Sequence, residues 1–164
     1  MSPLPITTIY AKDPALLSPS EVLSLKPGTK ELKQRLMWEY PKLTDPNELY
    51  SGMLDVLKWY PNDQEWINLF GKLLRDKKRR IYAMIALGKY KSRKYEKQIY
   101  AICIDKGKVV WEAFQSLFEM NSPYLLKAVE KAKSQASNET NIKESRKLLE
   151  TIEKKYYERQ RRPK

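Results

Sequence analysis

The residues with the clearest chemistry in this chain are two clusters of lysine and arginine with tyrosines set among them. They are Lys77, Lys78, Arg79 and Arg80 in the first cluster, and Lys89, Tyr90, Lys91, Arg93, Lys94, Tyr95 and Lys97 in the second. Such cations neutralise phosphates, and counterion release makes the binding depend on salt far more than on sequence. Exposed tyrosines would add stacking on unpaired bases, so RNA or a single strand is the favoured nucleic acid.

Both clusters belong to a basic central segment, residues 72–108, that differs from the rest of the chain. It holds thirteen Lys and Arg against three Asp and Glu, and so carries +10 of the chain's formal net charge of +12. Apolar runs at 81–87 and 99–104 are set between the charges. Since apolar runs need a core, we expect a folded basic surface and not a detachable tail. Tyr82 and Tyr100 are expected to pack with their hydroxyls at its rim.

Composition argues against most kinds of catalytic site. The 164 residues include no histidine and one cysteine, so the commonest general base and the usual zinc ligands are missing. Carboxylate pairs such as Asp45 with Glu48 and Asp63 with Glu65 could hold Mg²⁺, but they also suit helix capping, which is favoured. Cys103, between two isoleucines, is expected to be a buried small hydrophobe. We expect no enzyme, no catalytic residue, no metal and no cofactor.

The elements that must position the basic clusters are expected to be mostly helices. Five glycines in the whole chain leave little room for tight β-turns. Capping residues, several followed by proline, mark helix starts at Ser18, Thr29, Asp45 and Ser122. The expected fold class is therefore mainly α, a compact multi-helix domain with a small β-hairpin or meander within residues 79–112.

Helix and strand compete within residues 79–112. Residues 79–90 fit a helix, yet 81–87 also alternate as a strand would, and the same ambiguity holds for 95–104. Residues 105–108 could form a hairpin turn or a glycine stop at a helix C-terminus. Alanines and the helical neighbours favour helix.

The expected domain organisation has three parts. Residues 1–17 contain three prolines and are predicted to form an extended arm. Residues 18–158 are predicted to form a single helical domain around the basic segment 72–108, and residues 159–164 a basic tail.

A stripe of apolar residues near the C-terminus raises the question of self-association. Its members, at nearly seven-residue spacing, are Ile142, Leu149, Ile152 and Tyr156. Packing of a terminal helix on its own domain is favoured over a dimer seam, because the stripe is short for a coiled coil. Self-association through 142–156 or through the N-terminal arm stays open.

One short peptide resembles a known partner motif. The run Tyr40, Pro41, Lys42 and Leu43 is similar to the YPxL late-domain motif with which viral matrix and Gag proteins recruit the membrane-scission machinery. The resemblance implies that these four residues would bind a partner. Tyr40 and Pro41 also suit the end of a helix, so both roles stay open.

Three hypotheses of function follow. The leading one is a non-enzymatic basic protein that binds nucleic-acid phosphates, and a small viral structural protein of nucleocapsid or matrix type would fit its size and charge. The second is a peripheral matrix-like protein that binds anionic membrane through the same patch. The third is a helical regulator whose Trp59 and Trp66 contact a protein partner. No transmembrane run or signal-peptide pattern is present, so the cytoplasm, the nucleus or a virion is the expected location.

Overall fold

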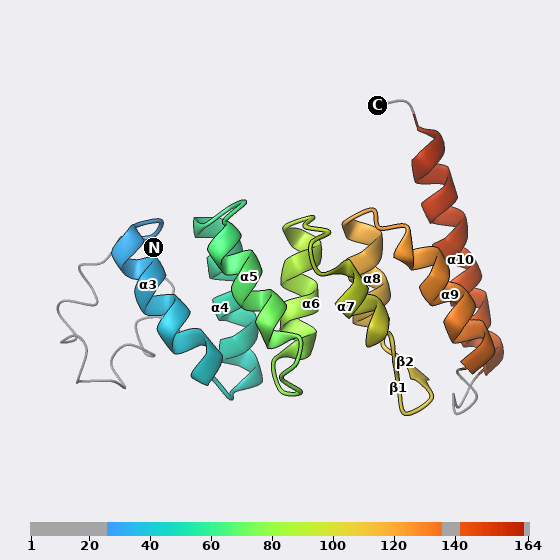
Figure 1. The fold of residues 1–164 in the computed structure, drawn as a ribbon, viewed down its shortest axis with the longest axis horizontal. Coiled ribbons are helices and arrows are strands. Elements are labelled where there is room, and N and C mark those ends of the chain that lie inside the picture. The colour runs from blue at the N-terminus through green and yellow to red at the C-terminus, as the bar shows by residue number, and fades with distance from the viewer. Residues whose placement is uncertain (1–25, 136–141, 163–164) are drawn as a thin grey trace. The chain divides into compact units, whose positions relative to one another are not determined.

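The computed structural model describes residues 26–135 and 142–162 (Figure 1). These residues form eight α-helices, one 3-10 helix and one two-stranded hairpin. In chain order they are α3 (Lys30–Glu39), η1 (Tyr40–Lys42), α4 (Pro46–Trp59), α5 (Gln64–Leu73), α6 (Arg80–Lys89), α7 (Glu96–Ala101), β1 (Ile104–Asp105), β2 (Lys108–Val109), α8 (Trp111–Glu119), α9 (Tyr124–Gln135) and α10 (Ile142–Arg161). The predicted fold class, mainly α with a small hairpin, is confirmed. The predicted arm 1–17 and the helix start at Ser18 lie outside the described residues.

The chain divides into two compact units, Met1–Ala86 (unit 1) and Leu87–Lys164 (unit 2), with the division inside α6. This division splits the basic segment 72–108. The cluster at residues 77–80 belongs to unit 1, and the cluster at residues 89–97 belongs to unit 2. A single domain over residues 18–158 stays a prediction.

Helices of unit 1 begin at residues whose side chains cap them. Thr29, Asp45 and Asp63 each accept a hydrogen bond from a backbone amide in the first turn that follows, and Pro46 occupies the first position of α4. The Asp63 carboxylate also lies 3.1 Å from the Lys33 ammonium, which ties α3 to the start of α5. Asp45 and Asp63 therefore have the expected capping role.

The core of unit 1 is built around Tyr40. Its ring meets the rings of Trp66 and Phe70 edge-on, with centroids 6.1 and 5.6 Å apart. Its hydroxyl donates a 2.8 Å hydrogen bond to the carbonyl oxygen of Leu49. Burial raises the pKa of the Tyr40 hydroxyl above its ordinary value. One side chain thus brings α4 and α5 against the end of α3.

The ambiguous segment resolves into two helices and a hairpin. Residues 80–89 and 96–101 are helical, so the strand alternative for 81–87 is wrong. In the hairpin, Ile104 pairs with Val109 and Asp105 with Lys108. Lys106 and Gly107 both have positive φ, as the favoured two-residue turn between antiparallel strands requires. The glycine therefore serves the hairpin turn, and the alternative of a helix stop at 105–108 is wrong.

The chain reverses direction after α6 through a left-handed helix ending. The Ser92 amide donates to the Leu87 carbonyl oxygen and the Lys91 amide to that of Gly88, while Lys91 has φ of 56°. This is the Schellman arrangement, which satisfies the last free carbonyls of a helix. Asn121 ends α8 in the same way, also with φ of 56°. Both reversals lead directly into the next helix of unit 2.

The core of unit 2 is shared by α7, α8, α9 and α10, with α9 in contact with the other three. Its fully buried apolar side chains include Ile99, Phe114, Leu117, Leu125 and Val129. Cys103 is also fully buried, as expected, and burial raises the pKa of its thiol.

Helix α10 packs on its own unit. Leu149 and Tyr156 are buried and α10 lies against α9, which confirms the favoured expectation for these two residues. The first part of the expected basic tail, residues 159–161, is the last turn of α10.

A close approach of α6 and α8 leaves little room for added volume at Gly88. A Cβ atom there would lie 3.0 Å from the Cα of Ser116, a backbone atom that cannot move aside cheaply. We predict that Gly88→Ala destabilises the protein by about 1–3 kcal/mol despite the better helix propensity of alanine. Urea unfolding followed by circular dichroism measures this change.

The matched control is Gly52→Ala, whose Cβ would meet the Tyr40 side chain at 3.2 Å and no backbone within reach. The loss of stability caused by Gly52→Ala should be smaller than that caused by Gly88→Ala, because the Tyr40 ring can shift by a few tenths of an ångström. A Gly88→Ala protein as stable as the wild type would contradict the close approach.

Candidate nucleic-acid interface

The first basic cluster is only partly available on unit 1. Lys77 and Lys78 are exposed. Arg79 is buried, and its guanidinium lies 2.5 Å from the carboxylate of Asp76. Arg80 is half-buried and donates from Nε to the carbonyl oxygen of Leu74. Two of the four predicted cations are thus committed to holding the turn before α6.

The second basic cluster surrounds the loop between α6 and α7 on unit 2. Lys91, Lys94 and Lys97 are exposed, whereas Tyr90 is buried. Tyr95 is half-buried, with the Lys94 ammonium 5.7 Å from its ring centroid. The exposed part of this loop therefore consists mainly of lysine side chains and not of aromatic rings.

Two further cations of this cluster face carboxylates. Lys89 lies 3.7 Å from Glu119. Arg93 donates from Nε and Nη2 to the two carboxylate oxygens of Glu96, at 2.9 and 3.2 Å. The charge that Lys89 and Arg93 can offer to a ligand is reduced by these pairs.

The peptide that resembles a late-domain motif is built into the fold of unit 1. Tyr40 and Leu43 are buried, Pro41 is half-buried and Lys42 is exposed. The side chains of Tyr40 and Leu43, which a partner would bind, are therefore packed in the core. In the same unit Trp66 is fully buried, so it offers no surface to the partner of a helical regulator.

A pair of stacked lysine–tyrosine contacts lies elsewhere in unit 2, between α7 and α9. The rings of Tyr100 and Tyr124 are 5.5 Å apart. The Lys127 ammonium lies 4.9 Å from the Tyr124 centroid, and the Lys131 ammonium lies 5.0 Å from the Tyr100 centroid. Beside them is an open, mainly polar groove, here called the α7–α9 groove, lined by Tyr100, Lys127, Glu130, Lys131, Ser134 and Gln135.

The electrostatics of the α7–α9 groove are cationic. Among the described residues, no carboxylate forms an ion pair with Lys127 or Lys131, whereas their neighbour Lys133 pairs with Glu153 at 3.6 Å. Glu130 is the acid that lines the groove, and it is exposed. Lys97, an exposed cation of the predicted cluster, is three residues before Tyr100 and so lies on the same face of α7.

The α7–α9 groove depends on a small hydrogen-bonded brace. The Ser122 hydroxyl, fully buried, accepts from the Tyr124 amide at 3.1 Å and thereby caps α9. The same hydroxyl donates to Glu96 at 2.7 Å, in the first turn of α7, and Glu96 also holds Arg93. The Ser122–Glu96 hydrogen bond thus joins the starts of α7 and α9, the helices that carry Tyr100 and Tyr124.

The brace also sets the protonation of Glu96. Burial by itself raises the pKa of this carboxyl, but the hydrogen bonds from Arg93 and Ser122 outweigh burial and hold the pKa below its ordinary value of 4.5. The carboxylate is therefore ionised at neutral pH and stays bound to both donors.

Sequence reasoning missed this groove although one signal for it was present. Tyr124, Lys127, Lys131 and Ser134 follow one another at intervals of three, four and three residues, which places them on one face of a helix. That spacing shows a shared face, but it does not show that Tyr100 will pack beside it.

Two other kinds of site find no support in the described residues. Residues 26–135 and 142–162 contain no group of three potential metal ligands. No helix within those ranges is both long enough and apolar enough to cross a membrane.

The brace gives a pH dependence with a definite sign. Because folding lowers the pKa of Glu96, its contribution to stability is present above about pH 4.5 and is lost as the pH falls through the folded-state pKa. We predict that Glu96→Gln costs about 1–3 kcal/mol near neutral pH and that this difference shrinks as the protein is acidified. Urea unfolding at several pH values measures it.

Glu150→Gln is the control, because Glu150 is an exposed residue of α10 for which no described ion pair exists. It should change stability little at any pH. A constant difference between wild type and Glu96→Gln across the acid range would show that the ionised brace does not stabilise the fold.

No protein-family model, curated protein or solved structure matches this chain.

Proposed function

We propose that this protein binds single-stranded nucleic acid through the α7–α9 groove of unit 2. The observation that carries the proposal is the pairing of two cations that line one open groove, Lys127 and Lys131, with neighbouring tyrosine rings. Tyr100 lines the groove itself, and Tyr124 packs beside Tyr100. Cationic grooves with aromatic side chains are the usual means of binding single strands without sequence preference.

Each partner in these contacts suits one part of a nucleotide. A lysine ammonium is a compact point charge on a flexible stem, and it pairs readily with phosphate oxygens. Its contact with a tyrosine ring is worth only about 0.5–1 kcal/mol at an exposed site, so a phosphate can compete for it. When the lysine turns to the phosphate, the half-buried ring of Tyr100 is left for a base.

The same surface extends to Lys97, which shares a face of α7 with Tyr100. Three cations around two aromatic rings offer more than one phosphate contact, and each contact adds to the salt dependence of binding. A membrane-surface helix would instead present large apolar side chains along its buried face. The groove presents one tyrosine, Tyr100, among charged and polar side chains, which favours nucleic acid over lipid.

The first test changes the charge of the groove. We predict that Lys127→Glu/Lys131→Glu lowers affinity for a fluorescent oligouridylate at least about tenfold and reduces the slope of log K against log salt by about 0.7 for each phosphate that the variant no longer neutralises. Both lysines are at least partly exposed, so the fold should survive. Fluorescence anisotropy at several salt concentrations gives affinity and slope together.

A second double variant, Lys147→Glu/Lys154→Glu, makes the same change in net charge at exposed positions of α10. Its slope should stay close to that of the wild type. If both variants lose affinity equally, binding follows net charge and the groove has no special role. Retention on anionic vesicles with no binding to the oligonucleotide would favour the membrane alternative.

The aromatic part of the site has its own signature. We predict that Tyr100→Leu costs about 1–3 kcal/mol of affinity while the salt slope is unchanged, because stacking involves no counterion. Tyr100→Phe keeps the ring and should bind as the wild type does. Equal affinity for the Leu and Phe variants would exclude stacking at this position.

A further inference from the structure

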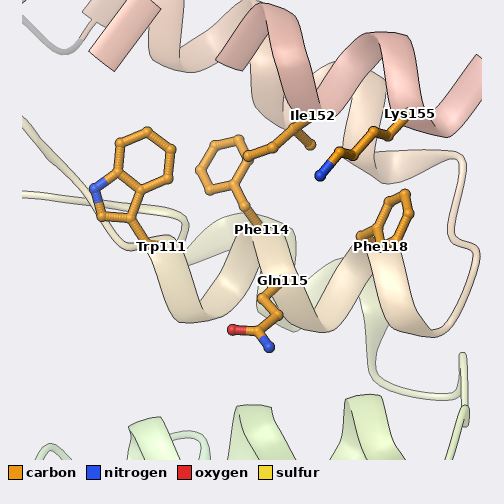
Figure 2. Close-up of a pocket in the computed structure, with 6 residues that line it drawn as sticks. All are labelled: Trp111, Phe114, Gln115, Phe118, Ile152 and Lys155. Atoms are coloured by element: carbon orange, nitrogen blue, oxygen red, sulfur yellow. The ribbon is translucent and has the colours of Figure 1, made fainter. Parts of the chain in front are cut away.

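A second concave feature of unit 2 lies between α8 and α10. Figure 2 shows the side chains of Ile152 and Lys155 projecting from α10 toward those of Phe114 and Phe118 on α8. The pocket, here called the α8–α10 pocket, has a volume of about 290 Å³ and is lined by Trp111, Phe114, Gln115, Phe118, Ile152 and Lys155. Apart from the Lys155 ammonium and the edge residue Gln115, its walls are apolar.

The α8–α10 pocket continues along α10 into a basic hollow. The hollow shares Phe118 and Lys155 with the pocket and is completed by Glu158, Arg159 and Arg162. An apolar end and a basic end therefore lie next to each other, separated by the shared residues Phe118 and Lys155, with Glu158 as the acid that lines the basic end.

The guanidinium of Arg159, at the basic end, is held in place by neutral groups. The Arg159 guanidinium lies 5.0 Å from the centroid of the Phe118 ring and donates from Nη1 to the Phe118 carbonyl oxygen. Among the described residues, neither Lys155 nor Arg159 forms an ion pair with a carboxylate. A guanidinium has five N–H donors, so Arg159 keeps donors for a ligand.

We propose that this surface binds an acidic amphipathic segment of a partner protein. A large apolar side chain of the segment enters the apolar end beside Trp111, and its carboxylates pair with Lys155 and Arg159, which are one helical turn apart. A helix that lays its apolar face into a groove between two helices is a recurring mode of recognition. Aromatic and arginine side chains are also the usual energetic centres of protein interfaces.

The size and openness of the pocket favour a peptide over a small molecule. Pockets for drug-sized ligands span about 300–1,000 Å³ and bury most of the ligand. The α8–α10 pocket, at about 290 Å³, is just below that range and is partly open to solvent, which suits one or two side chains of a longer segment. The basic hollow beside it gives such a segment a second anchor of opposite charge.

The test uses a fluorescent synthetic peptide with leucines on one helical face and glutamates one turn apart beside them. A scrambled peptide of the same composition keeps the charge and removes the pattern. At about 0.15 M salt, where long-range attraction is screened, the patterned peptide should bind and the scrambled one should bind at least about tenfold more weakly. NMR spectra of the ¹⁵N-labelled full chain should show the largest shifts in α8 and α10, including the Trp111 indole.

Two variants probe the two ends separately. Trp111→Ala and Lys155→Glu should each weaken binding about tenfold. Lys155→Glu should also bind a peptide with lysines in place of the glutamates better than the wild type does. Lys127→Glu/Lys131→Glu serves as a control and should leave peptide binding unchanged, so this proposal can fail or succeed independently of the nucleic-acid groove.

Several outcomes would overturn the proposal. Equal binding of the patterned and scrambled peptides would show attraction by net charge alone. If the patterned peptide does not bind, an acidic amphipathic segment is not the ligand of this surface. Shifts in α8 and α10 caused by dodecanoate but not by the patterned peptide would assign the pocket to an acyl chain.

Discussion

The starts of α7 and α9 in unit 2 are joined by one part-buried contact, the hydrogen bond from the Ser122 hydroxyl to Glu96. Ser122 caps α9, and Glu96 lies in the first turn of α7 and holds Arg93. Removal of a helix cap costs about 1 kcal/mol, and a hydrogen bond to a charged group contributes about 1.5–3 kcal/mol. The two helices joined at their starts in this way carry Tyr100 and Tyr124, whose ring centroids are 5.5 Å apart beside the α7–α9 groove.

The cations that are available on the surface of this protein are not those of its most basic sequence segment. Arg79, Lys89 and Arg93 are all paired with carboxylates, and Arg79 is buried as well. Pairing makes these cations less available to a ligand. Lys127 and Lys131 lie outside the most basic segment and contact aromatic rings. Because neither forms an ion pair within the described part of the chain, their charge is less neutralised. Net charge therefore indicates the class of ligand, whereas local pairing decides where it can bind.

Sequence could predict those features whose signals are local. Asp45 and Asp63 cap helices through their own first turns, so their role is visible in a few residues. For the hairpin at 104–109 the sequence leaves two alternatives, a hairpin turn or the end of a helix, because Gly107 suits both. The α7–α9 groove joins side chains from two helices separated by the hairpin and α8, and no local pattern specifies which faces will meet. The burial of Arg79 and of Tyr40 depends on tertiary packing in the same way.

The most direct test of the central claim is an NMR titration of the ¹⁵N-labelled chain with a short oligouridylate. The proposed function predicts that the largest shifts fall on α7 and α9, around Tyr100, Tyr124, Lys127 and Lys131. Shifts spread evenly over exposed lysines, such as Lys77, Lys78 and Lys154, would indicate diffuse attraction by net charge. That result, or the absence of any shift in α7 and α9, would contradict the proposal.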